Sequence, residues 1–184
     1  IGALQLYTGG SDFTAFTSLT TIDGGISMYN NVSQPFLSFN GLQGFTKLRI
    51  NNIPNNMPSF AGLENLTELS GGTYSFGSDP SCNCSCNSGN TVMTDLSPLS
   101  NLTVLDVNLS FEDSNLGIDA ADLAMLSGVK TLGGLTWYQC GGNVPINDIS
   151  GLKPTKITGS ITLTIPPGFV GLATFFGGVT EVGG

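Results

Sequence analysis

Four cysteines are the side chains with the most distinctive chemistry in this chain. Cys82, Cys84 and Cys86 alternate with other residues, and the fourth is Cys140. An even number of thiols in an acidic chain rich in Asn and Thr is typical of an oxidising compartment, so we expect two disulfides. One of them should join Cys140 to the 82–86 cluster. A soft-metal thiolate site is the alternative, but it needs a reducing compartment, and the chain has no histidine to contribute.

Asparagine offers a second candidate chemistry, N-linked glycosylation. With 16 Asn and 38 Ser and Thr in the chain, roughly three Asn-x-Ser/Thr sequons would arise by chance. Asn83 is expected to be the most accessible acceptor, because it lies in the Cys-rich segment. Asn65 and Asn101 share one position of the repeat described below, where an asparagine can instead satisfy backbone groups at a turn. The five sequons are those of Asn31, Asn65, Asn83, Asn101 and Asn108.

Acidic residues cluster only within residues 112–122. The run 113–117 is faintly similar to a calcium loop, but the bidentate glutamate that would end such a loop is missing. Asp119 and Asp122 are better explained as the N-terminal cap of a helix. No Asp/Glu pair lies on a recognisable glycosidase scaffold, and no glycine pair opens a phosphate-binding motif. We therefore expect no metal, no other cofactor and no enzymatic activity.

The charge balance limits the class of partner. The 184 residues carry 5 Lys and Arg, 13 Asp and Glu and no histidine, for a net charge of −8. This charge excludes nucleic acid and anionic lipid as partners, and the lack of histidine excludes a Ser-His-Asp triad and a His-ligated metal. The most apolar stretch, 169–179, is half the ~20 residues that a membrane span requires. Because Ile1 opens the chain without a signal peptide, we expect a processed, secreted or cell-surface product, or a fragment.

An internal repeat predicts the elements that position these side chains. In each copy, apolar residues recur three apart, a glycine-containing pair follows, and apolar residues then alternate with polar ones. The first copy runs from Phe13 through Gly24-Gly25 to Met28. The first anchors of the copies are 20 to 27 residues apart, with one step of 36, and they are Phe13, Phe39, Phe60, Leu96, Leu123, Ile149 and Phe169.

Each part of the repeat predicts a local structure. The three-residue spacing favours a helical or 3₁₀ turn, in which residues three apart lie on one side. The glycine pair is expected to turn a corner at low steric cost, and the alternating residues then form a half-buried strand. Stacked units give a parallel β-solenoid. We therefore predict one domain over 1–184 with about seven repeats and a Cys-rich loop inserted at 77–93.

Two segments carry a resemblance to a known family. They read Phe16-Thr-Ser-Leu19-Thr-Thr-Ile22-Asp-Gly-Gly-Ile26 and Leu63-Glu-Asn-Leu66-Thr-Glu-Leu69-Ser-Gly-Gly. Both resemble the receptor L-domain type of leucine-rich repeat, which occurs in insulin- and EGF-receptor ectodomains and in microbial surface proteins. The resemblance implies a right-handed β-solenoid with parallel sheets and short helical or 3₁₀ turns. It also implies a non-catalytic extracellular protein, and it says little about any ligand.

The two ends of the chain suggest a structural function. Solenoids usually finish in polar capping repeats, but residues 1–7 read as a bare strand and residues 179–184 as a coil that lacks its strand. Joining the tail to the head restores the repeat, so we predict a head-to-tail homopolymer, a filament or a surface fibre. An excerpt of a longer repeat protein would use the same geometry. The predicted interface residues are Ile1, Leu4, Leu6, Phe175, Phe176, Val179 and Val182.

A receptor-like or adhesin module that binds a glycan or a surface protein is the alternative function. Trp137, Tyr138 and the 77–93 loop would supply its contacts, because aromatic side chains make the best anchors. Trp137, however, is better explained as a core residue of its strand. An ice-binding face is not expected, because threonine does not recur at one outward strand position of successive repeats.

Overall fold

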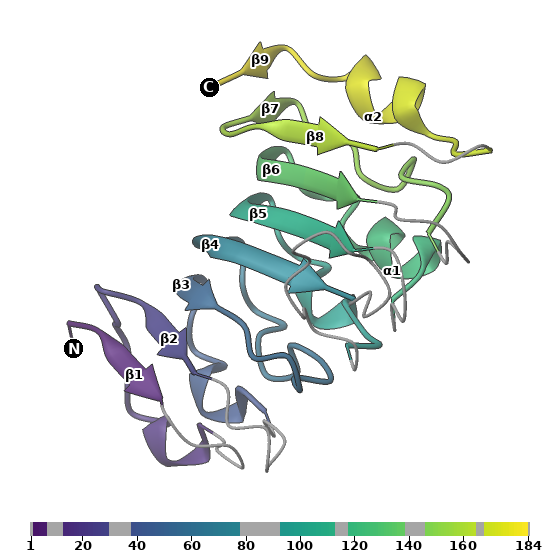
Figure 1. Cartoon of the computed structure of the whole chain (residues 1–184). Coiled ribbons are helices and arrows are strands. Elements are labelled where there is room, and N and C mark those ends of the chain that lie inside the picture. The colour runs from purple at the N-terminus through teal and green to yellow at the C-terminus, as the bar shows by residue number, and fades with distance from the viewer. Residues whose placement is uncertain are drawn as a thin grey trace.

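The computed structural model describes residues 2–6, 13–29, 38–77, 93–112, 118–138, 146–164 and 168–183. In this part of the chain, nine strands form one parallel sheet, and short helical segments accompany it (Figure 1). The strands are β1 (Leu4–Leu6), β2 (Ile26–Met28), β3 (Lys47–Asn52), β4 (Glu68–Phe76), β5 (Val104–Glu112), β6 (Thr131–Tyr138), β7 (Lys156–Ile157), β8 (Ile161–Leu163) and β9 (Glu181–Val182). The helical segments are η1 (Thr14–Phe16), η2 (Asn40–Leu42), η3 (Ser97–Leu99), α1 (Ala120–Met125) and α2 (Leu172–Gly177).

The strands follow one another across the sheet in chain order. The order is β1-β2-β3-β4-β5-β6-β7-β9, and β8 also pairs with β6. Strands β7 and β8 therefore occupy the first and second halves of one coil, alongside Leu132 and Leu135 of β6 respectively. Because every pairing is parallel and the strands are added coil by coil in chain order, the arrangement is compatible with a solenoid of stacked coils.

The predicted helical turns are confirmed in the structure. The N–H of Phe16 donates to the Phe13 carbonyl at 2.8 Å, and the N–H of Leu99 donates to the Leu96 carbonyl at 2.9 Å. These bonds span three residues, as in a 3₁₀ turn, so the apolar side chains three apart all lie on the core side. The Leu66 and Leu102 side chains, at equivalent repeat positions, are both buried.

Aromatic side chains form two ladders through the core. Phe39 stacks on Phe13 and on Phe60, with ring centroids 5.3 and 6.3 Å apart. In the second half of the sheet, Phe111 lies 5.1 Å from Trp137 between ring centroids. Trp137 is only 3% exposed, which confirms its assignment to the core. Such ladders fix the register of neighbouring coils, because each ring contacts the ring above and below.

The expectation that every glycine pair turns a corner is wrong for two of them. Gly71-Gly72 lie inside β4 and Gly133-Gly134 inside β6. A Cβ at Gly71 would overlap the Ile50 backbone, so these glycines permit close approach of neighbouring strands where the register shifts. Of these three pairs, Gly24-Gly25 meets the expectation, since Gly25 adopts a φ of 77° immediately before β2.

Candidate functional site

The core side chains are buried in the middle of the sheet, and some of them are partly exposed at its two ends. Among the described residues, the partly exposed apolar members of the core belong to the first or the last coils. Strands β1 and β9 lie at the same two ends of the stack (Figure 1). The partly exposed members are Leu4, Leu6, Phe16 and Leu19 at the β1 end, and Ile161, Leu163, Phe169, Leu172 and Val179 at the β9 end.

The β9 end exposes two large apolar side chains predicted for the interface. Val182 is 66% exposed and Phe176 is 42% exposed. Phe175, in contrast, is fully buried, so its assignment to the interface was wrong. Successive residues of a helix point about 100° apart, so α2 turns Phe175 into the core while Phe176 faces outward. Val179 is half-buried between these extremes.

At the β1 end of the sheet, strand β1 covers only part of the coil that contains β2. Leu4 and Leu6 are half-buried and lie opposite Ile26 and Met28 of β2. The preceding segment, residues 20–22, belongs to no strand. An open groove of about 300 Å³ lies between this segment and residues 44–47. Ile1, also predicted for the interface, lies outside the described residues.

A column of exposed threonines runs along the coils where each strand begins. The Thr67 N–H donates to the Thr46 carbonyl at 2.8 Å, and the Thr67 hydroxyl donates to the same oxygen at 3.1 Å. Thr103 repeats both bonds to Thr67, and Thr180 repeats them to Thr155. The threonine column is Thr46, Thr67, Thr103, Thr155 and Thr180, with Lys130 in the one remaining place.

Sequence reasoning missed this column, although a signal for it was present. Threonine directly follows the apolar anchor in Phe45-Thr46, Leu66-Thr67 and Leu102-Thr103. The ice-binding hypothesis considered threonines at outward strand positions, which lie further along the chain than these three. The column is hydrogen-bonded to the backbone of the preceding coil, so its first function is to align coils.

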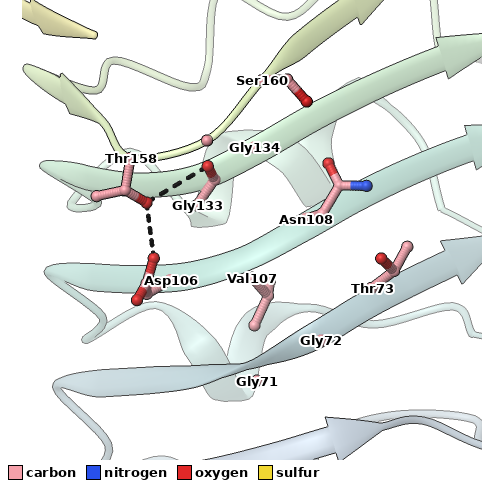
Figure 2. A pocket seen from close by; sticks show the side chains of 11 residues that line it. Gly71, Gly72, Thr73, Asp106, Val107, Asn108, Gly133, Gly134, Thr158 and Ser160 are labelled. Atoms are coloured by element: carbon pink, nitrogen blue, oxygen red, sulfur yellow. Dashed lines mark hydrogen bonds between the residues drawn. The ribbon is translucent and has the colours of Figure 1, made fainter. Parts of the chain in front are cut away.

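The outer face of the sheet carries a shallow depression of about 460 Å³ (Figure 2). Glycines of β4 and β6 form part of its lining, together with Asp106 and Asn108 of β5. The Thr158 hydroxyl donates to the Asp106 carboxylate at 2.7 Å, crossing β6 at Gly133. A side chain at Gly133 would overlap the Val107 backbone, so glycine is needed for this close packing. The depression offers a carboxylate, an amide and hydroxyls to a polar ligand, and no described aromatic ring lines it.

The predicted glycosylation acceptors have different surroundings. The Asn65 side-chain amide donates to the Gln43 carbonyl, and that of Asn101 donates to the Glu64 carbonyl, both at 2.8 Å. The backbone-satisfying role considered for this repeat position is therefore present in both. The Asn108 amide lies on the sheet face, 3.3 Å from the Thr136 hydroxyl. Asn31 and Asn83 lie outside the described residues.

The predicted cap is confirmed. The Asp119 carboxylate accepts hydrogen bonds from the Ala121 and Asp122 N–H groups at 2.7 and 3.1 Å. The Asp122 carboxylate in turn accepts from the Asp119 N–H at 2.8 Å, which completes a capping box for α1. The run 113–117, considered as a calcium loop, lies outside the described residues. In the described ranges, no group of three Cys, Asp or Glu side chains could hold a metal ion.

Other predicted features fall in parts of the chain that the structure does not describe. All four cysteines and residues 78–92 of the predicted insertion lie outside the described residues, as does the Tyr138 side chain. Strands β4 and β5 are nevertheless direct neighbours, paired from Glu68–Val104 to Phe76–Phe111.

No helix in the part of the chain that the structure describes has the length and apolar character to cross a membrane.

Comparisons with known proteins add no relative. A scan against protein-family models, a search of curated proteins and a search of solved structures each found no match. The resemblance to receptor L domains therefore stays a prediction from the repeat itself.

Proposed function

We propose that this chain is a non-enzymatic extracellular structural protein, a solenoid of the leucine-rich-repeat or receptor L-domain type whose copies stack head to tail into a filament or surface fibre. The observation that carries the proposal is the position of the partly exposed core side chains. They lie at the two ends of the sheet, whereas the middle coils bury theirs. Each end is therefore suited to receive another coil.

The energetics favour covering these ends. Burying a Val or Phe side chain completely stabilises by about 1.5–3 kcal/mol. Val182 and Phe176 would contribute only part of this, in proportion to their exposure of 66% and 42%. Half-buried residues at the opposite end add to the total. Because association itself costs about 4–15 kcal/mol, stacking requires all of these contacts together with the backbone hydrogen bonds of the sheet edge.

Charge opposes stacking at low ionic strength. Each copy carries a net charge of −8, so copies repel one another at long range. Salt screens that repulsion and strengthens the burial of apolar surface when the anion is sulfate or phosphate. We therefore expect that the association between copies survives or increases when salt is added, unlike an interface held by ion pairs.

Two exposed apolar residues provide a matched test. Val182→Asp places a carboxylate on the β9 end, and Met125→Asp places one on α1 in the middle of the molecule, where Met125 is 44% exposed. We expect light scattering and electron microscopy to show loss of large particles for V182D and no change for M125D. Equal loss in both variants, or particles that persist in V182D, would contradict the proposal.

A second candidate function, the binding of a glycan or another polar ligand, is favoured by the depression over β4–β6. Its Asp106, Asn108 and Thr158 side chains supply acceptors and donors suited to sugar hydroxyls. Asp106→Ala should abolish binding on a glycan array, while Thr155→Ala, on the threonine column, should leave it unchanged. An array without hits for the unmodified protein would eliminate this candidate.

A further inference from the structure

We infer that stacked copies join in one defined register, in which residues 20–22 of one copy dock beside Thr180 and β9 of the next. In this register the Thr180 carbonyl accepts hydrogen bonds from the N–H and the hydroxyl of Thr20 in the other copy. The inference rests on the proposed head-to-tail stacking and adds to it the pairing of particular atoms.

The first support is the rule that the threonine column follows within the molecule. Thr67, Thr103, Thr155 and Thr180 each donate the N–H and the hydroxyl to the carbonyl of the column residue one coil earlier. For Thr155 these bonds reach the Lys130 carbonyl at 2.8 and 3.2 Å, and for Thr180 they reach the Thr155 carbonyl at 2.9 and 3.1 Å. The rule holds whether the acceptor residue is Thr or Lys, because the acceptor is backbone.

The second support is that the two ends carry complementary groups. Within the described ranges, the Thr180 carbonyl receives no hydrogen bond, and the Thr20 N–H and hydroxyl donate none. Thr20 and Thr180 are both exposed. Thr180, the last residue of the column, therefore offers an acceptor, and Thr20, in the coil before Thr46, offers two donors, the combination that each bonded step of the column uses.

The third support is that the apolar residues around these threonines match in spacing. The segment Phe16-x-x-Leu19-Thr20-x-Ile22 has the same pattern as Phe176-x-x-Val179-Thr180-x-Val182. Internal coils repeat it, for example as Leu63-x-x-Leu66-Thr67-x-Leu69, where the three apolar side chains are buried. With Thr20 beside Thr180, Phe176 meets Phe16, Val179 meets Leu19 and Val182 meets Ile22.

The charges near the junction are compatible with this register. Glu181 is already paired with Lys156, at 2.6 Å between the carboxylate oxygen and Nζ. Its counterpart across the junction is Thr21, which is neutral. The register therefore places no charge directly opposite another of the same sign in these columns.

Mixing two end-blocked variants tests the direction of stacking. Thr20→Asp removes the hydroxyl donor and sets a carboxylate against the Thr180 carbonyl, and V182D blocks the other end. Both positions are exposed, so both variants should fold, which circular dichroism can verify. We expect each variant alone to be a 19.0 kDa monomer. Their equimolar mixture should form a one-to-one dimer, because each retains the end that the other lacks. A mixture that stays monomeric would overturn the inference.

Photo-crosslinking tests the register itself. A benzoylphenylalanine at position 176, in a mixture of isotope-labelled and unlabelled copies, should crosslink between copies to the peptide that contains Phe16. The same probe at Met125 is the control and should give no crosslink between copies. Crosslinks from position 176 to β4–β6 in particles that still form would refute the register and leave stacking intact. A protein that stays monomeric at high concentration would refute both.

Discussion

The middle and the ends of this molecule are built from the same repeat and differ in how completely they close. Strands β4 and β5 have nine residues each, and the core side chains beside them are buried. Strands β1 and β9 have three and two residues, and core side chains beside them are half-exposed. The difference teaches that a coil of this type closes when it lies between two neighbours. Stability therefore comes from interfaces between coils, as in other repeat proteins.

The largest expected effect is on a closed coil. Leu66→Ala or Leu102→Ala should lower the free energy of unfolding by about 2–5 kcal/mol, because each removes a fully buried side chain. Leu4→Ala, at the half-buried β1 end, should cost clearly less. Denaturant unfolding of the three variants measures this, with Thr67→Ala as the outward control. Equal sensitivity of Leu4 and Leu66 would show that the ends are as closed as the middle.

Mapping the cysteines tests whether a covalent link also stabilises the middle of the molecule. We expect a disulfide between Cys140 and one of Cys82, Cys84 and Cys86. Removing it should cost about 2–4 kcal/mol, because it closes a long loop. Peptide mapping without reductant measures the connectivity directly. Four free thiols would contradict both the disulfide and the assignment to an oxidising compartment.

Glycine substitutions distinguish close strand approach from a simple turn. Gly133→Ala should destabilise by about 1–3 kcal/mol, because its Cβ would overlap the Val107 backbone between β5 and β6. Gly44→Ala is the control, since no atom lies within 4 Å of its Cβ position. Thermal unfolding compares the two. A tolerated G133A would mean that the strands can separate there, and the depression on the sheet face would then be adaptable.

Tyr74 should make the closed coils sensitive to alkaline pH. Burial raises the pKa of the Tyr74 hydroxyl above its usual range, and the hydroxyl donates to the Ile50 carbonyl at 2.9 Å. Its neutral form is therefore favoured in the folded state, so this stability is present below about pH 10 and is lost as pH rises beyond it. Tyr74→Phe should cost about 1 kcal/mol at neutral pH and reduce the alkaline loss. An unchanged alkaline slope in Y74F would assign that loss to other groups.

The repeat allowed much of the fold to be predicted, and its failures have physical causes. Spacing alone identified the 3₁₀ turns and buried anchors such as Leu66 and Leu102, because apolar periodicity reports directly on burial. It did not reveal that Gly71-Gly72 lie inside a strand. A glycine pair signals either a turn or a close approach, and only the neighbouring strand distinguishes them. Phe175 and Phe176 were equally apolar in sequence, and only the orientation of α2 separates the buried ring from the exposed one.

The central claim is that the open ends are covered by other copies of this chain. Light scattering of the unmodified protein over a range of concentrations and salt, with electron microscopy of the same samples, tests it most directly. The account predicts particles much larger than 19.0 kDa that grow with concentration and persist or increase as salt is added. A monomer of 19.0 kDa at every concentration and salt would contradict it.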